Sequence, residues 1–194
     1  IFEGTNEINR LLIPNRYYRL TAKEEADPGR ALAALRECFR GPFSSAGGPL
    51  AGEREAVATL RGVFALCWSL AVKTYGHGLV EEQEIALRLA DLAILLYAAE
   101  SAVLRAVKAA GREGPERSEL KRALAASYVA DALVKAEAAA RGIVSAAACG
   151  AKRAEMIREI QRACGDYELQ AGGMIRTNRF IAERLYEAEK YVTR

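Results

Sequence analysis

The fold of this chain is decided by residues 83–103, QEIALRLADLAILLYAAESAV. Apolar side chains recur in this stretch at spacings of four and three residues, which places them on one face of an α-helix. These positions are Ile85, Leu89, Leu92, Leu96, Ala99 and Val103. A stripe of this length buries against other helices, in a bundle or in a long antiparallel pair. We therefore expect an all-α fold built around this segment.

Helical patterns also occupy the sequence on both sides of that segment. We expect about five main helices after Gly52, each ended by residues that break a helix. The expected ranges are 53–76, 85–111, 116–148, 152–171 and 175–192, with breaks at His77-Gly78, Gly114-Pro115, Gly150 and Gly172-Gly173. The expected inward faces are Val57, Leu60, Phe64, Cys67, Leu70 and Ala71 in the first helix and Leu120, Leu124, Tyr128 and Leu133 in the third. The predicted architecture is an antiparallel helical bundle.

The amino-acid composition agrees with this fold class, and the charge balance argues against one kind of partner. The chain has 194 residues, of which 51% are hydrophobic and 27% charged, as in a globular domain of ordinary size. Alanine, leucine, arginine and glutamate are plentiful, and β-branched residues form no runs, so a mainly β fold is excluded. Lys and Arg total 28 against 25 Asp and Glu, a net charge of +3. This balance does not indicate a nucleic-acid partner.

Cysteine and histidine usage argues against a metal site. The cysteines are Cys38, Cys67, Cys149 and Cys164. They are widely spaced without a C-x-x-C pair, and His77 is the single histidine, so the usual zinc frameworks are excluded. We expect buried thiols on helices, a reducing cytoplasm and no disulfide scaffold. No signal peptide is visible, and the longest charge-free stretch of mainly apolar residues, 62–72, is far shorter than a membrane span.

The part of the chain before Gly52 has a different residue pattern from the helical part that follows. Residues 5–13 show helical spacing, with Thr5 or Asn6 available as the N-cap and Pro14 expected at the helix end or in a kink. Residues 22–54 are rich in proline and glycine, and we interpret them as a linker that contains one short helix at 31–39. Residues 55–194 then form the C-terminal helical domain.

One acidic residue near the beginning of the chain has surroundings suited to catalysis. Glu3 lies between apolar Ile1 and Phe2 and the glycine Gly4, directly before a helix start. Apolar surroundings raise the pKa of a carboxylate toward the range that a general base needs. Gly4 permits close approach of a substrate, and the helix start can hold a polar or anionic group. By itself the pattern also fits an ordinary capping acid.

The same stretch resembles the signature of the acyl-CoA dehydrogenase family. That signature has an aromatic residue, Glu-Gly-Thr, polar residues and Ile-x-Arg-Leu, here from Phe2-Glu3-Gly4-Thr5 to Ile8-Asn9-Arg10-Leu11. Further stretches look like the C-terminal extension of the very-long-chain members. They are Gly41-Pro42-Phe43 with the following Ser-Ala-Gly, Gly78–Gln83, Arg88–Asp91 and Leu95–Tyr97. The length of chain after Glu3 also fits that subgroup.

The resemblance implies a role for each signature residue. Glu3 falls where most of the family keeps the base that removes the α-proton of the acyl-CoA thioester. Gly4 falls where the backbone lies against the substrate, and Thr5, Asn6 and Glu7 fall where the family contacts FAD. The β-hydrogen leaves as hydride to the flavin, which gives a trans-2-enoyl-CoA in fatty acid β-oxidation. The resemblance further implies electron-transferring flavoprotein as acceptor and a homodimer.

The resemblance also implies that this chain is a part of a larger enzyme. It begins at Ile1, without methionine and inside the signature, so we expect residues 1–21 to be the end of the dehydrogenase core. The flavin and most of the substrate contacts would come from elsewhere in the parent protein. We predict that the parent is an active FAD-dependent dehydrogenase acting on long acyl chains. The isolated 194-residue chain is predicted to be inactive and to bind no flavin.

Two other interpretations stay open at this stage. Residues 55–194 fit a non-catalytic interaction module for dimerisation or for docking to a membrane surface or a partner. No helix is strongly basic on one face and apolar on the other, so support for a peripheral membrane contact is partial. In the second interpretation, the parent protein is an inactive homologue that serves as a scaffold. The presence of Glu3 argues against this interpretation.

Overall fold

The computed structural model describes residues 5–21, 25–38, 48–170 and 174–190, and these contain helices and turns but no strand. The helices are α1 (Asn6–Thr21), α2 (Pro28–Cys38), α3 (Ala51–Tyr75), the 3₁₀-helix η1 (Gly76–Val80), α4 (Gln83–Arg117), α5 (Glu119–Ala147), α6 (Gly150–Gln170) and α7 (Met174–Ala188). The predicted all-α fold class is confirmed.

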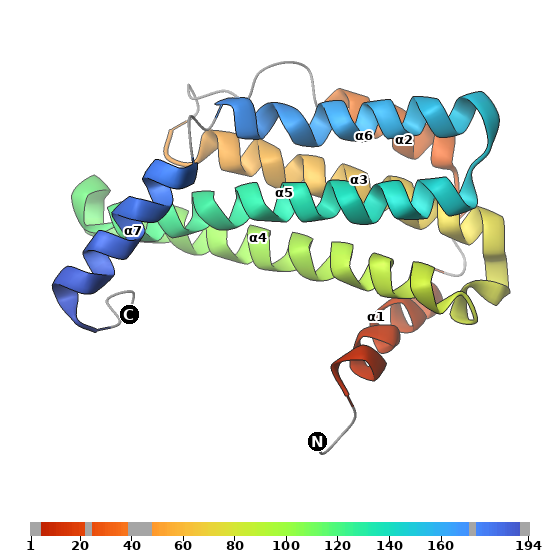
Figure 1. The fold of residues 1–194 in the computed structure, drawn as a ribbon, viewed down its shortest axis with the longest axis horizontal. Helices are drawn as coiled ribbons and strands as arrows, with labels where there is room; N and C mark the ends of the chain where they lie inside the picture. The colour runs from red at the N-terminus through yellow and green to blue at the C-terminus, as the bar shows by residue number, and fades with distance from the viewer. Residues whose placement is uncertain (1–4, 22–24, 39–47, 171–173, 191–194) are drawn as a thin grey trace.

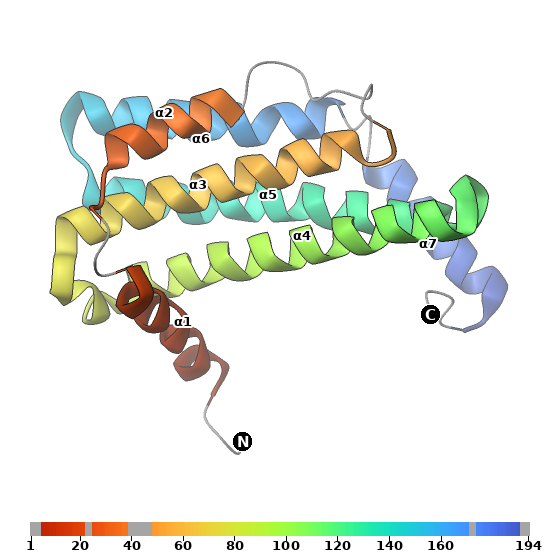
Figure 2. The same cartoon turned by 180° about the vertical axis from the view of Figure 1, so that it is seen from behind.

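Four long helices, α3 to α6, run up and down beside one another and form the bundle (Figure 1). Helices α3 and α5 each contact the other three helices of the bundle. Helix α2 packs on α3 and α6. Figure 2 shows α2 along one side of the bundle. Helices α1 and α7 pack at opposite ends, α1 on α4 and α7 on α5.

The apolar stripe that decides the fold faces the interior as predicted. Ile85, Leu89, Leu92, Ala99 and Val103 are buried, and Leu96 is half-buried against the same core. The predicted face of α3 is also buried, except for the half-buried Phe64. These side chains form one continuous cluster with those of α5 and α6. The bundle is therefore held together by burial of apolar surface.

The inward face of α5 differs from the expected one. Of the four residues predicted to point inward, only Leu133 is buried, whereas Leu120, Leu124 and Tyr128 are half-buried. The buried positions are Ala125, Val129, Ala130, Ala132, Leu133, Ala136, Ala140, Ile143 and Val144. Helix α5 has neighbours on several sides, and alanines let them approach closely. A pattern of large apolar residues underestimates such a face because alanine buries little area.

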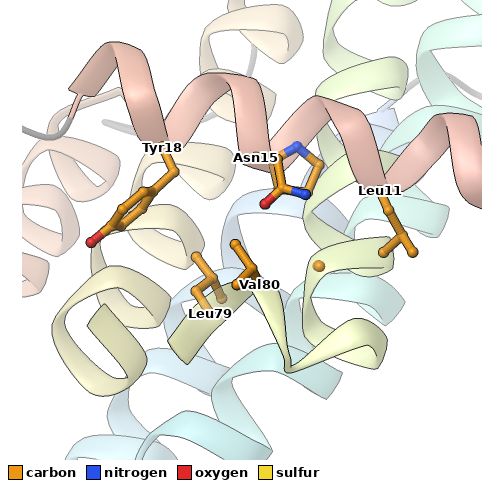
Figure 3. Close-up of a pocket in the computed structure, with 7 residues that line it drawn as sticks. Leu11, Asn15, Tyr18, Leu79 and Val80 are labelled. Atoms are coloured by element: carbon orange, nitrogen blue, oxygen red, sulfur yellow. The ribbon is translucent and has the colours of Figure 1, made fainter. Parts of the chain in front are cut away.

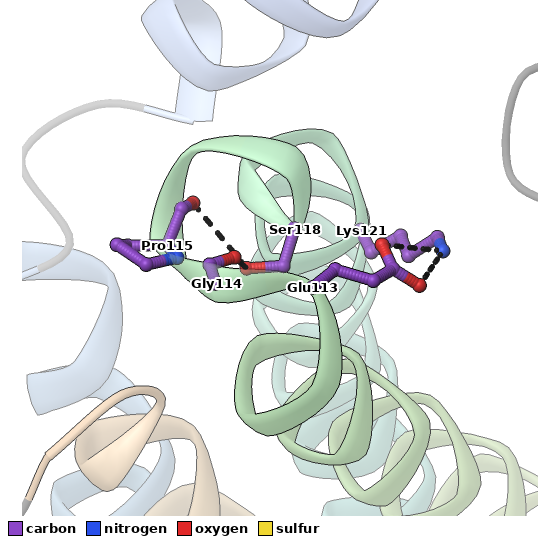
Figure 4. Close-up of polar contacts among 5 residues, drawn as sticks. All are labelled: Glu113, Gly114, Pro115, Ser118 and Lys121. Atoms are coloured by element: carbon purple, nitrogen blue, oxygen red, sulfur yellow. Dashed lines mark hydrogen bonds and ion pairs between the residues drawn. The ribbon is translucent and has the colours of Figure 1, made fainter.

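The corner between α4 and α5 lies at the predicted break. Gly114 has φ 82° and ψ 172°, a conformation that favours glycine, and Pro115 begins one further helical turn. The Ser118 hydroxyl donates to the Gly114 carbonyl at 2.7 Å, and Lys121 Nζ lies 2.7 Å from Glu113 Oε1 (Figure 4). These contacts fix the corner on both sides of the glycine.

Part of the segment interpreted as a linker is a packed helix. Leu32 and Leu35 of α2 are buried, and Arg36 forms ion pairs with Glu155 at 2.7 Å and Glu159 at 3.2 Å. The Asp27 carboxylate accepts hydrogen bonds from the amides at the start of α2. A helix was expected here, but its docking on α3 and α6 was not. The division of the chain into three domains stays a prediction.

Among the described residues, one stretch has the length and composition of a membrane span. It lies within Ala51–Val80, where an 18-residue window has a mean hydropathy of 1.4. Its most apolar window is 61% buried inside the bundle. A core helix satisfies the same criteria, and the packing of α3 against α2, α4, α5 and α6 accounts for its apolar character.

Candidate functional site

The predicted site residues lie at the start of the chain, and the structure describes only some of them. Glu3 and Gly4 lie outside the described residues. Thr5, Asn6 and Glu7 lie together at the beginning of α1, and all three are exposed. The Thr5 side-chain oxygen accepts a hydrogen bond from the Ile8 amide at 3.4 Å, so Thr5, one of the two predicted candidates, is the N-cap of α1.

Helix α1 is longer than the sequence predicted. It continues through Pro14 to Thr21, whereas the expected helix ended near Ile13. Pro14 lacks an amide proton, so the helix gives up the hydrogen bond to the carbonyl of Arg10. Pro14 is also the one buried residue of α1, packed where this helix meets the bundle. The contact with the bundle compensates the lost hydrogen bond, which a local pattern does not show.

An ion pair attaches the N-terminal half of α1 to the bundle. Arg10 Nη2 of α1 pairs with Asp91 Oδ1 of α4. Their side chains are 25% and 42% exposed, and the Nε atom of Arg10 is buried without a hydrogen-bond partner. Because the two residues are 81 positions apart in the chain, no local sequence pattern could predict this ion pair.

Aromatic contacts attach the C-terminal half of α1. The Tyr17 ring meets the edges of Trp68 and Phe64, with centroid distances of 4.6 Å and 5.4 Å. Tyr18 Oη and Nδ1 of His77 form a hydrogen bond of 3.3 Å. His77 lies in η1, at the corner between α3 and α4. Figure 3 shows Leu11, Asn15 and Tyr18 of α1 facing Leu79 and Val80 of η1. The single histidine therefore contacts α1 through Tyr18.

The cavities beside α1 differ greatly in size. The crevice in Figure 3 has a volume of about 10 Å³, which leaves room for no more than a water molecule. A larger groove of about 350 Å³ lies between α1, α3 and α4 and is lined mainly by apolar and aromatic side chains. Within the described residues, no group of three or more His, Cys, Asp or Glu side chains is placed to hold a metal ion.

The cysteines divide into two pairs. Cys67 and Cys164 are buried as expected, whereas Cys38 and Cys149 are exposed, and all four carry free thiols. Burial raises the pKa of the Cys164 thiol to about 12 and raises the pKa of the Cys67 thiol still further. Both buried thiols stay protonated at neutral pH, so they behave as small apolar side chains rather than as nucleophiles.

Comparison with known proteins identifies the family. Residues 59–162 match the family described as acyl-CoA dehydrogenase, C-terminal domain. The chain belongs to this family. Its helical bundle is the part of the chain that carries the match, and the predicted resemblance to acyl-CoA dehydrogenases is confirmed at the family level.

Two relatives extend the likeness along nearly the whole chain. A probable acyl-CoA dehydrogenase of Bacillus subtilis (strain 168) is 31% identical over 193 residues, which is 98% of this chain and 32% of the relative. The crystal structure of an acyl-CoA dehydrogenase complexed with FAD from Bacillus anthracis matches with a TM-score of 0.82 and 31% identity, again over 98% of this chain and 32% of that one. The acyl-CoA dehydrogenase domain described here thus spans about a third of the length of both relatives.

Proposed function

We propose that this chain is the C-terminal part of an FAD-dependent dehydrogenase that converts long-chain acyl-CoA to trans-2-enoyl-CoA. The observation that carries the proposal is the likeness over 98% of the chain to an acyl-CoA dehydrogenase complexed with FAD. The signature that this chain resembles runs from Phe2 to Leu11, and Glu3 to Glu7 belong to it. The preference for long acyl chains rests on the resemblance of residues 41–47 and 78–97 to the very-long-chain members.

Glu3 would act as the base in this reaction. The α-proton of a thioester is weakly acidic, so its removal needs a carboxylate that is close to it and shielded from water. The bound FAD supplies the electron sink that accepts the β-hydride. Gly4, next in the chain, has no side chain to keep the substrate at a distance.

The first turn of α1 fits a role in holding the cofactor. Thr5, Asn6 and Glu7 are exposed there, and the helix N-terminus favours negatively charged groups such as phosphates. The Thr5 hydroxyl accepts a hydrogen bond from the helix and keeps its own proton for donation. We assign these three residues to FAD contacts in the assembled enzyme.

The outer face of α1 supports its placement in a larger protein. Ile8, Leu12 and Leu20 are 56%, 60% and 68% exposed, and their spacing places them along one side of the helix. In the proposed enzyme this apolar row packs against the dehydrogenase core. Without that core, Glu3 would lie in water with nothing to deprotonate. We therefore propose that the isolated 194-residue chain is inactive and binds no flavin.

The remaining parts of the proposal concern partners and location. We propose electron-transferring flavoprotein as the electron acceptor, a homodimeric enzyme, and the cytoplasm as the site of fatty acid β-oxidation. The net charge of +3 gives no support to a nucleic-acid partner.

The test is to purify the full-length protein and to record its absorbance and its products. The proposal predicts flavin bands and formation of 2-enoyl-CoA from saturated acyl-CoA, with higher kcat/KM for long chains than for short ones. The matched control is the 194-residue chain, which should be colourless. A full-length protein without flavin would contradict the proposal, and one that holds flavin but does not turn over would indicate a scaffold.

A second candidate function is docking through α7. This helix has no buried residue, and Ile175 and Tyr186 are 71% and 82% exposed. Its charged residues are three arginines and two glutamates, so the polar face is only weakly basic. Sedimentation with anionic vesicles would indicate a membrane surface, whereas a stable dimer without vesicles would indicate assembly. Substitution of both Ile175 and Tyr186 by serine should abolish whichever of the two is observed.

A further inference from the structure

The attachment of α1 leads to an inference that rests on the proposed function and deepens it. We propose that Asp91, through its ion pair with Arg10, is a positioning residue that orients α1 and thereby the first turn of that helix, which follows the base Glu3 in the chain. Asp91 touches neither substrate nor flavin in this proposal. It acts through the helix that follows Glu3 in the chain.

Apolar packing alone leaves the orientation of α1 weakly determined. Pro14 is its one buried residue, and several of its apolar side chains face outward. A helix with so little buried area has little to fix its rotation about its own axis, because apolar burial is not directional. An ion pair with a hydrogen bond has a preferred geometry, so it adds a directional constraint on the N-terminal half of α1, as the Tyr18–His77 hydrogen bond does on the C-terminal half.

The position of the pair along α1 lets it direct the first turn of the helix. The aromatic contacts of Tyr17 and the hydrogen bond of Tyr18 hold the end of α1 that is farther from Glu3. The N-terminal end of α1 points away from the bundle (Figures 1 and 2). Arg10 lies between these two ends, so its contact with Asp91 sets the direction in which the first turn projects.

The surroundings of Arg10 make Asp91 hard to replace. The Arg10 side chain is 25% exposed, and its Nε atom is buried without a hydrogen-bond partner. Loss of the Asp91 charge would leave a partly buried guanidinium without its counter-charge. Such a group moves toward water, and α1 moves with it.

The test uses Asp91→Asn in the full-length protein, with Glu100→Gln as the matched control. Glu100 lies on the same helix, is 41% exposed and pairs with Arg61 of α3, not with α1. A misplacement of about 1 Å at a reacting group can cost up to about 100-fold in rate. We expect Asp91→Asn to lower kcat about 10-fold with KM changed less than about twofold, and Glu100→Gln to leave both unchanged.

A second readout does not depend on turnover. Hydrogen exchange of the α1 amides should be at least about 5-fold faster in Asp91→Asn than in Glu100→Gln, with equal exchange in α5. If Asp91→Asn folds poorly, the reversed pair Arg10→Asp with Asp91→Arg should recover most of the kcat that Arg10→Asp alone loses.

Equal kcat and equal α1 exchange in the two single variants would overturn the inference while leaving the proposed function intact. A reversed pair no better than Arg10→Asp alone would also overturn it. A flavin-free or inactive wild-type protein would instead overturn the proposed function, and this inference with it.

Discussion

The α4–α5 pair and helix α1 are held in place by different kinds of interaction. Helices α4 and α5 share a wall of buried apolar side chains within the continuous core of the bundle. Helix α1 has one buried residue and is held by an ion pair, a hydrogen bond and aromatic edges. Burial of apolar area gives most of the stability, whereas directional contacts give position. In this chain, the residues assigned to chemistry are next to the helix with the weaker attachment.

The comparison is tested most strongly in the core of α5. Leu133 is 1% exposed, and Leu133→Ala should lower the free energy of unfolding by about 2–5 kcal/mol because it leaves a cavity. The neighbouring Val134 is 52% exposed, so Val134→Ala should change it by less than about 0.5 kcal/mol. Urea denaturation of both variants gives the two values. Similar losses in both would mean that the bundle core does not carry the stability.

The reactivity of each thiol distinguishes the cysteines in the core from those on the surface. Burial raises the pKa of Cys67 and Cys164, so these thiols should react with a thiol reagent at least about 100-fold more slowly than the exposed Cys38 and Cys149. Mass spectrometry after timed labelling reads each cysteine separately. Labelling in denaturant should make all four rates alike. Fast native labelling of Cys67 would show that the bundle opens readily.

The aromatic attachment of α1 should be worth less than the core. Tyr17→Ala removes the ring contacts to Trp68 and Phe64 and should cost about 1–2 kcal/mol. Trp68 is the single tryptophan of the chain and is 8% exposed, so its fluorescence should shift to longer wavelength as water reaches it. Tyr97→Ala, at a side chain that is 75% exposed, is the control and should leave the spectrum unchanged.

The smallest effect is expected at the start of α2. This helix is attached both by buried apolar side chains, like α4 and α5, and by ion pairs, like α1. Hydrogen bonds from the amides of Arg30 and Gly29 hold the pKa of Asp27 below its usual value. Because the folded pKa is lowered, this stabilisation is complete above about pH 4 and is lost as the pH falls through the folded value. Asp27→Ala should therefore lower Tm slightly at pH 7 and by less at pH 2.5. An equal difference at both pH values would assign the effect to something other than this carboxylate.

The sequence predicted the parts of the molecule whose signal is local. The stripe from Ile85 to Val103, the break at Gly114 and the Thr5 cap each depend on residues a few positions apart, and the structure confirms them. The inward face of α5 was predicted in part only, because its alanines carry a weak apolar signal.

The contacts of α1 and α2 could not be predicted in the same way. The passage of α1 through Pro14 and the docking of Leu35 depend on tertiary packing that overrides local preference. Arg10 and Asp91 are 81 positions apart, and their pairing appears only in three dimensions. For the site, the comparisons confirmed the resemblance at the level of the family, whereas the roles of Glu3, Gly4, Thr5, Asn6 and Glu7 stay predictions.

The most direct measurement of the account is the turnover of Glu3→Gln in the full-length protein. Glutamine keeps the shape of the side chain and cannot accept the α-proton, so kcat should fall at least about 100-fold while the flavin absorbance is unchanged. Glu116→Gln, at an exposed position near the far end of α4, is the control and should turn over as the wild type does. A Glu3→Gln protein with wild-type turnover would contradict the account.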